Sequence, residues 1–179
     1  ADNGSTAVDI ALKMSFQYYK NKGLTKPYFV SLENSYHGES IAALSISDMG
    51  LYKDVYDEIL IKSIKTSSPK DQSEEEALRA LGELEILLKD RASEISAVII
   101  EPLVQCAGSM SMYSPKYISG LRELCTKYDV LFIADEIAVG FGRTGKIFAH
   151  HHAKIKPDFL CLSKGLTAGY LPLSVTLTT

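Results

Sequence analysis

Two side chains that could do chemistry each follow an apolar run of the sequence. Asp135 comes directly after Val130–Ala134, and Lys164 follows Phe159–Leu162 with one serine between. A lysine amine can attack a carbonyl carbon to form a Schiff base. A carboxylate at the end of a buried segment is costly unless a cation or a hydrogen-bond donor accompanies it. The pair therefore suggests a nucleophile and an anion that hold one ligand.

The apolar runs predict how these two side chains are positioned. Near-continuous Val, Ile, Leu and Phe are typical of parallel strands covered by helices on both faces. Ligands of such sheets bind beyond the carboxyl ends of the strands. We therefore expect Asp135 and Lys164 to face one crevice, with the Lys164 amine partly desolvated. A lysine imine and an aspartate paired with a pyridinium nitrogen are what pyridoxal phosphate (PLP) requires of a protein.

Each of these residues also has an ordinary structural interpretation. Asp135 could form a salt bridge or cap a helix, and most lysines are simply solvated. Gly4 and Ser5 stand at the expected start of a helix, where free N–H groups and the helix dipole favour a phosphate. The same residues could be an ordinary helix cap. Tyr36 follows a predicted strand and could stack on a planar ring or pack on its neighbours.

Other polar residues near these positions are weaker candidates. Glu101 ends a third apolar strand and could orient a side chain over the site or cap a turn. Glu136 should point away from Asp135. Consecutive residues project in different directions, so the run His150–His152 chelates a metal poorly and is expected to pack or face solvent. No metal site is predicted.

The expected elements alternate between strands and helices. Strands are predicted at 28–32, 59–61, 95–100, 130–135 and 159–162, and helices from a start within Asp2–Ser5 to about 21–23, at 40–46, at 73–91 and at 114–128. Ser73 followed by Glu76 matches a capping box, and residues 67–71 read as a loop. Repeated strand–helix–strand units predict an α/β fold of three layers, α/β/α, with a mostly parallel sheet.

The amino-acid composition of the chain limits the classes of protein to which it can belong. The 179 residues are 46% hydrophobic and 23% charged with a net charge of −3, which argues against a nucleic-acid-binding face. Cys106, Cys125 and Cys161 are odd in number and read as reduced, buried residues of a cytoplasmic protein. Nothing predicts contact with a membrane. The chain opens in a loop without methionine, so we expect one domain, residues 1–179, from the interior of a longer enzyme, with no second domain present.

Four motifs together resemble the class III PLP-dependent aminotransferases. They are Ile133–Ile137, Gly140–Gly145, Pro157–Asp158 and Ser163–Leu166. The resemblance covers the whole chain and implies the large domain of a fold-type I PLP-dependent transferase. Within the family, the stretches Asp2–Val8, Glu101–Gln105, Met110–Tyr113, Leu166–Leu173 and Thr176–Thr179 are similar to the subgroup that acts in biotin biosynthesis.

The resemblance assigns roles residue by residue. Lys164 would be the catalytic residue: it would bind PLP covalently, contact substrate and move a proton at the substrate α-carbon. Asp135 would hold the pyridine nitrogen protonated, and Gly4 and Ser5 would bind the phosphate. Tyr36 would lie against the ring and touch substrate. The implied reaction moves an amino group from S-adenosylmethionine to 8-amino-7-oxononanoate, giving 7,8-diaminononanoate, in a homodimer.

At three positions the residue differs from the one that is common in some members of the family. Ala138 stands where ornithine- and 4-aminobutyrate-type relatives usually carry glutamine, which favours the biotin subgroup. Val139 replaces a common threonine, and Cys106 replaces a common glycine. The family's substrate-binding aromatic residues, its carboxylate-binding arginine and its glycine–proline–threonine loop have no counterpart here, so the segment alone is expected to be inactive.

Other functions stay open at this stage. The first alternative is another class III enzyme, an ω-amino-acid aminotransferase or an aminomutase. The amino donor could also be lysine instead of S-adenosylmethionine. A non-catalytic module that binds a phosphate ligand would use the helix start as its anion site and Lys164 as a counter-charge, without a covalent adduct. A fourth possibility is a structural segment that holds no cofactor without its partner subunit.

Overall fold

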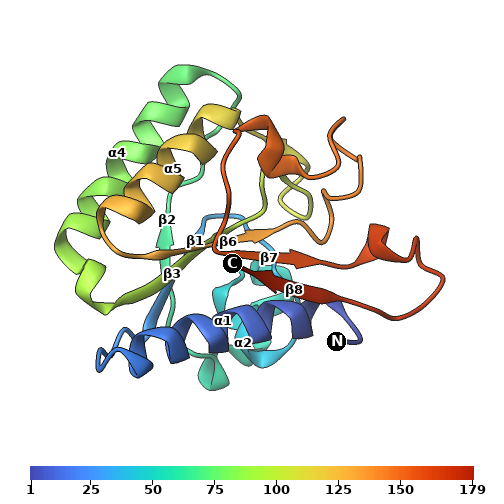
Figure 1. Cartoon of the computed structure of the whole chain (residues 1–179), viewed down its shortest axis with the longest axis horizontal. Helices are drawn as coiled ribbons and strands as arrows, with labels where there is room; N and C mark the ends of the chain where they lie inside the picture. The colour runs from blue at the N-terminus through green and yellow to red at the C-terminus, as the bar shows by residue number, and fades with distance from the viewer.

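A six-stranded sheet forms the centre of the computed structural model, which describes all residues, 1–179 (Figure 1). The strand order is β2-β1-β3-β6-β7-β8; every neighbouring pair is parallel except β7 and β8. The strands are β1 (Tyr28–Leu32), β2 (Ile64–Thr66), β3 (Ile95–Ile100), β6 (Leu131–Asp135), β7 (Phe159–Leu162) and β8 (Val175–Thr178). The mostly parallel α/β sheet that the sequence predicts is confirmed.

Helices cover both faces of the sheet. Helices α1 (Gly4–Asn21) and α2 (Ile41–Ile46) lie on one face, and α4 (Glu74–Arg91) and α5 (Pro115–Lys127) lie on the other (Figure 1). The remaining elements are short: α3 (Gly50–Lys53), the hairpin of β4 (Val104–Gln105) and β5 (Ser111–Met112), and the 3-10 turns η1 (Asp54–Ile59), η2 (Ala92–Glu94), η3 (Ala149–His152) and η4 (Lys164–Leu166).

Alternation along the strands divides the core in two. In β3, Val98 and Ile100 join the cluster under α4 and α5, whereas Ala97 and Ile99 join the cluster under α1 and α2. Successive strand residues point to opposite faces, so a strand covered on both sides must be apolar throughout. All six residues of β3 are buried, and five of them are apolar. The exception, Ser96, donates its hydroxyl hydrogen to the Lys26 carbonyl.

The helix starts follow the cap residues with one correction. Asn3 Oδ1 accepts the Thr6 N–H at 3.0 Å, and Ser73 Oγ accepts the Glu76 N–H at 3.2 Å. The capping box is only half formed, because the Glu76 carboxylate does not reach back to the Ser73 N–H. It accepts the Lys70 N–H at 3.0 Å instead, and the Ser73 N–H donates to Asp71.

The strand predicted at 59–61 is wrong. The strand of this region is β2, five residues further on, and it pairs with β1 at the edge of the sheet. The Ile61 N–H donates to Ser45 Oγ at 2.9 Å, and Ser63 Oγ donates to the Ser45 carbonyl at 2.7 Å. Because α2 satisfies these polar groups, the segment follows α2 before it can enter the sheet.

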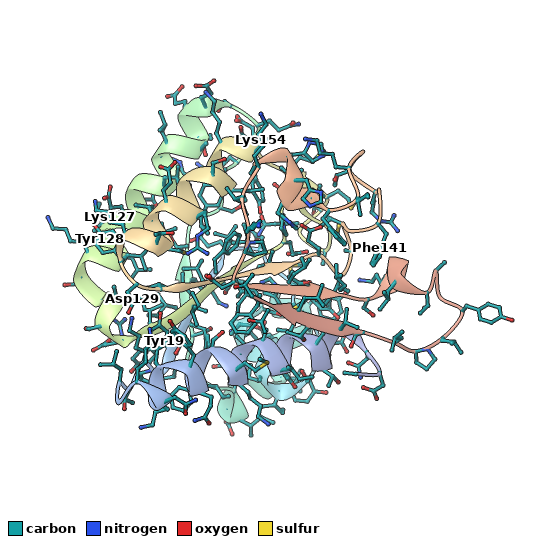
Figure 2. The ribbon with its side chains drawn as sticks, viewed as in Figure 1. Tyr19, Lys127, Tyr128, Asp129, Phe141 and Lys154 are labelled. Atoms are coloured by element: carbon teal, nitrogen blue, oxygen red, sulfur yellow. The ribbon has the colours of Figure 1, made fainter.

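Helix α1 is anchored at its carboxyl end. Tyr19 Oη donates to the Asp129 carbonyl at 2.7 Å, which ties α1 to the turn between α5 and β6. Figure 2 shows Tyr19 and Asp129 together at one end of the molecule, with Phe141 at the opposite end. The anchor therefore fixes the helix so that its amino end lies beyond the carboxyl ends of the strands.

No helix is both long and apolar enough to cross a membrane.

Two residues of α4 test the core. Leu88 is fully buried, whereas Ile86 is 72% exposed on the same helix. Removal of a buried leucine side chain costs about 2–5 kcal/mol of unfolding free energy, because it loses apolar burial and leaves a cavity. We expect Leu88→Ala to show that loss in urea unfolding and Ile86→Ala, the matched control, to change stability by less than about 0.5 kcal/mol. Equal losses would contradict the orientation of α4.

Candidate active site

The predicted site residues meet in one cavity beyond the carboxyl ends of β1, β3, β6 and β7. Its volume is about 270 Å³. Its wall includes all five residues predicted from the sequence: Gly4, Ser5, Tyr36, Asp135 and Lys164. The loop after β1, the loop after β3, the amino end of α1 and the turn after β7 thus contribute to one site.

Asp135 is buried and paired inside the protein. Only 4% of its surface is exposed. Its Oδ2 lies 2.7 Å from Nδ1 of His37, and its Oδ1 accepts the Ile137 N–H at 3.2 Å. Each oxygen of an ionised carboxylate has two lone pairs, so these bonds leave acceptor capacity on the side that lines the cavity. The contact with His37 thus gives this buried carboxylate a partner within the chain, and a ligand can still add a further donor.

His37 is the functional residue that sequence reasoning missed. Its side chain is fully buried, and it also lines the cavity. Its Nε2 has no hydrogen-bond partner in the chain, although buried polar atoms are nearly always paired. The available signal was a histidine directly beside Tyr36 after an apolar strand, 98 residues from the aspartate that it contacts.

The amino end of α1 and the loop after β1 touch through a glycine. Gly38 has a φ of +126°, and a Cβ there would overlap Ser5 Oγ. Ser5 Oγ accepts the Glu39 N–H at 3.1 Å. The N–H groups of Gly4 and Ser5 donate no hydrogen bond within the chain. Two free N–H groups at the positive end of an 18-residue helix form a potential anion site.

Tyr36 lies in the cavity wall but packs on its neighbours. Its ring is 5.4 Å from that of Tyr52, with 58° between the planes, and its Oη donates to Glu39 Oε1 at 2.9 Å. Burial, followed by the bond to Glu39, raises the pKa of the Tyr36 hydroxyl to about 12. The hydroxyl is therefore protonated at neutral pH and can act as a donor.

Glu101 holds two loops of the cavity wall. Its Oε2 accepts the Tyr36 N–H at 3.0 Å, and its Oε1 accepts the Cys106 N–H at 3.2 Å. Burial raises the pKa of this carboxyl group to about 7; the charge of His37 opposes the rise and that of Asp135 adds to it. The sequence suggests two roles for Glu101, to cap a turn and to orient a side chain over the site. It does the first through the Cys106 N–H, and it contributes to the second by fixing the backbone of Tyr36.

Lys164 lines the cavity, but it is exposed and not buried as the sequence predicted. Strand β7 ends at Leu162, so Lys164 begins the turn η4 outside the sheet. Its φ is +32°, which a non-glycine residue rarely adopts and which often marks a functional position. Phe141 covers the next residue, since a Cβ on Gly165 would lie 2.9 Å from Phe141 Cβ.

The segment after η4 returns to the start of α1. The Ser174 N–H donates to the Ala1 carbonyl at 2.8 Å, and Ser174 Oγ donates to the Asn3 carbonyl at 2.6 Å. These bonds fix the free N–H groups of Gly4 and Ser5 relative to the turn that carries Lys164.

Glu136 and the histidine run belong to the opposite face of the sheet. The Glu136 carboxylate accepts the N–H groups of Ala149 and His150 at 2.6 and 2.7 Å and lies 2.7 Å from His150 Nδ1. The prediction that Glu136 points away from the site is confirmed, and His150 serves in packing. Cys125 and Cys161 are buried free thiols, whereas Cys106 is only half-buried, contrary to the prediction. It lies in the cavity wall.

The residues of the cavity fit pyridoxal phosphate. The free N–H groups at the start of α1 suit its phosphate, and the remaining acceptor capacity of Asp135 suits a protonated ring nitrogen. The exposed amine of Lys164 on the same cavity suits its aldehyde.

Comparison with known proteins agrees with this chemistry. Residues 1–179 match the model of the aminotransferase class-III family. The chain is 52% identical over 180 residues to adenosylmethionine-8-amino-7-oxononanoate aminotransferase of Helicobacter pylori, covering 99% of this chain and 41% of that protein. The chain thus spans about two-fifths of the length of this relative.

Solved structures give the same fold. The adenosylmethionine-8-amino-7-oxononanoate aminotransferase of Methanocaldococcus jannaschii is 39% identical with a TM-score of 0.92, over 100% of this chain and 41% of that one. An amine transaminase from an uncultivated Pseudomonas species, in a PLP-bound form, is 34% identical with a TM-score of 0.92, over 100% of this chain and 42% of that one.

The pairing of His37 with Asp135 can be tested by stability. His37→Leu removes the ring donor and leaves a buried carboxylate with one hydrogen bond, and loss of one partner of a buried pair costs about 3–5 kcal/mol. We expect a loss of that order in urea unfolding. His37→Asn keeps an N–H donor near the same place and should lose clearly less. Equal losses would mean that shape, and not the donor, matters at this position.

The contact between Gly38 and Ser5 predicts a second difference. Gly38→Ala is strained by its φ and overlaps Ser5, whereas Gly23→Ala has a φ of +76° and nothing within 4 Å of the new Cβ. Strained backbone alone costs about 1–3 kcal/mol. We expect Gly38→Ala to unfold at lower urea concentration than Gly23→Ala. A Gly38→Ala protein as stable as the Gly23→Ala control would contradict the close approach of this loop to α1.

Proposed function

Because the chain belongs to the class III aminotransferases, a family of PLP-dependent enzymes, we propose that residues 1–179 are the PLP-binding large domain of a longer enzyme. Its reaction would transfer an amino group from S-adenosylmethionine to 8-amino-7-oxononanoate, giving 7,8-diaminononanoate in biotin biosynthesis. The observation that carries the proposal is that Lys164, Asp135 and the free N–H groups of α1 line one cavity. The names of the relatives support the substrates.

Each part of the cavity has a separate task. Bound PLP would supply an electrophilic carbon and an electron sink. Asp135, oriented by His37, would accept a hydrogen bond from the ring nitrogen and keep it protonated. The N–H groups of Gly4 and Ser5 would bind the phosphate, and Tyr36 would lie beside the ring and the substrate.

Lys164 would be the catalytic residue. Its Nζ would be the amine that binds the cofactor aldehyde covalently. As a free amine, Nζ would take a proton from the substrate α-carbon, which is general base catalysis by a positioned group. Its place on a turn, outside the sheet, gives the side chain room for both tasks.

The enzyme is further proposed to be a cytoplasmic homodimer. Exposed apolar side chains on two segments that follow cavity residues in the sequence support a subunit contact. Tyr170 is 90% exposed and Leu171 is 60% exposed on the segment after Lys164, and Met110 is 62% exposed near the β4–β5 hairpin. Such side chains are more typical of interfaces than of a free surface.

The covalent role of Lys164 is tested by trapping. The full-length protein is mixed with PLP, reduced with borohydride, digested and analysed by mass spectrometry. We expect a pyridoxyl group on Lys164 and its loss in Lys164→Ala. Lys154→Ala is the matched control, since Lys154 is also a lysine with positive φ (54°) but does not line the cavity. Absence of the adduct in a folded protein with excess PLP would favour a non-catalytic phosphate-binding module.

The substrates are tested by turnover. The full-length enzyme should form 7,8-diaminononanoate from 8-amino-7-oxononanoate with S-adenosylmethionine as donor. Asp135→Asn, which removes the negative charge opposite the ring nitrogen, should lower kcat by about 10²-fold or more. Turnover with lysine only, or with ω-amino acids only, would replace the proposed donor or substrate without changing the roles of Lys164 and Asp135.

A further inference from the structure

Glu101 connects two walls of the cavity that are far apart in the sequence. It follows β3 and is 5% exposed. One carboxylate oxygen binds the N–H of Tyr36, 65 residues earlier, and the other binds the N–H of Cys106, five residues later. A single side chain thus holds the loop after β1 and the loop after β3 at a fixed separation.

The carboxylate of Glu101 has no cationic partner of its own. It takes part in no ion pair, and its two side-chain hydrogen bonds come from neutral amides. The titratable groups around it come from every adjoining element: Tyr36 and His37 from the loop after β1, Asp135 from β6, and Cys106 and Tyr113 from the segment after β3. Lys164 and Arg143 add positive charge near Cys106.

The two protonation states of Glu101 cannot hold both loops equally well. An ionised carboxylate can accept one strong, charge-assisted bond on each oxygen. A protonated carboxyl group keeps one good acceptor, and its O–H needs an acceptor of its own. Protonation therefore weakens one of the two amide contacts while leaving the other.

We propose that Glu101 is a positioning residue that clasps the Tyr36 and Cys106 loops when ionised, and that protonation releases one of them, so that the shape of the cavity changes with pH. The proposal rests on the proposed function only for the identity of the ligand. The raised pKa of Glu101, about 7, places the change near neutral pH.

The clasp would affect the whole ligand site. The loop that carries Tyr36 also carries His37, which orients Asp135, and Gly38, which touches Ser5 at the anion site. The loop that carries Cys106 forms the facing wall. A movement of either loop would therefore change the contacts of the ring and of the phosphate together.

The pH dependence of stability follows from the raised pKa. Glu101 in the folded protein binds its proton up to about pH 7, whereas an unperturbed glutamate loses it near 4.5. Between these values the folded state binds more protons than the unfolded state, so the contribution of Glu101 to stability falls as pH rises through this window. Ionisation of Glu101 thus lowers the stability of the folded protein, which is typical of a group kept for function.

The first experiment measures amide hydrogen exchange without PLP. In the wild-type protein, the protection factor of the Tyr36 or the Cys106 N–H should fall as the pH is lowered through about 7. Glu101→Gln has only one acceptor oxygen, so one of the two amides should lose protection about tenfold or more at pH 8, and the pH dependence should disappear. Glu33→Gln, an exposed glutamate one residue beyond β1, is the matched control and should match the wild type.

The second experiment uses the native thiol of Cys106. It is the one cysteine of three that is not buried, and burial followed by the charge of Glu101 raises its pKa. We expect its rate of alkylation by iodoacetamide to show, in addition to thiol ionisation, an inflection near pH 7. Glu101→Gln should lose that inflection and react severalfold faster at pH 8. Cys106→Ser identifies the reacting thiol.

The outcomes separate this inference from the proposed function. Unchanged protection of both amides across pH 5–9 in the wild type would overturn the clasp, even if Glu101→Gln failed to fold. An identical alkylation profile in the wild type and a folded Glu101→Gln would also overturn it. Covalent labelling of Lys164 by PLP is measured separately, so a failed clasp with intact labelling leaves the aminotransferase assignment standing, and the reverse result leaves the clasp standing.

Discussion

The buried carboxylate of Asp135 is the constraint on which the cavity depends. A charge in this position is tolerated only because donors surround it. One donor is the backbone of Ile137, and the other is the ring of His37, whose loop must then lie against the end of β6. That requirement brings Gly38 against Ser5 and sets the amino end of α1 beside the same cavity. The contacts of Asp135 therefore position the loop after β1 and, through it, the amino end of α1.

Three carboxylates at the ends of two neighbouring strands have different environments. Asp135 faces His37 in the cavity, and Glu136 faces His150 and two amides on the other side of the sheet. Glu101 has two amides and no cation. The alternation of side chains along β6 separates the first two. The pairing of each fits the role proposed for it: an acceptor for a ring nitrogen (Asp135), a structural brace (Glu136), and a group that gains and loses a proton near neutral pH (Glu101).

The sequence was most informative where one residue decides a local structure. Near-continuous apolar runs located β1, β3, β6 and β7, and the polar stretch Asp2–Ser5 together with Ser73 and Ser114 located three helix starts. Prediction from the sequence failed where a contact between residues far apart in the sequence determines the structure. The strand expected at 59–61 is displaced because Ile61 and Ser63 donate hydrogen bonds to Ser45, and the exposure of Lys164 depends on where the turn η4 leaves the sheet. His37 was overlooked because its partner lies 98 residues away. No periodicity of residue types records such a pairing.

The bonds between Ser174 and the first residues of the chain have a consequence for the order of folding. They join positions more than 170 residues apart, near the largest sequence separation that this chain allows. Closing so long a loop costs conformational entropy before the contact contributes to stability. Such contacts are therefore expected to form after local helices and neighbouring strand pairs. We therefore expect the start of α1 and the turn that carries Lys164 to be brought together late in folding, after neighbouring strands have paired.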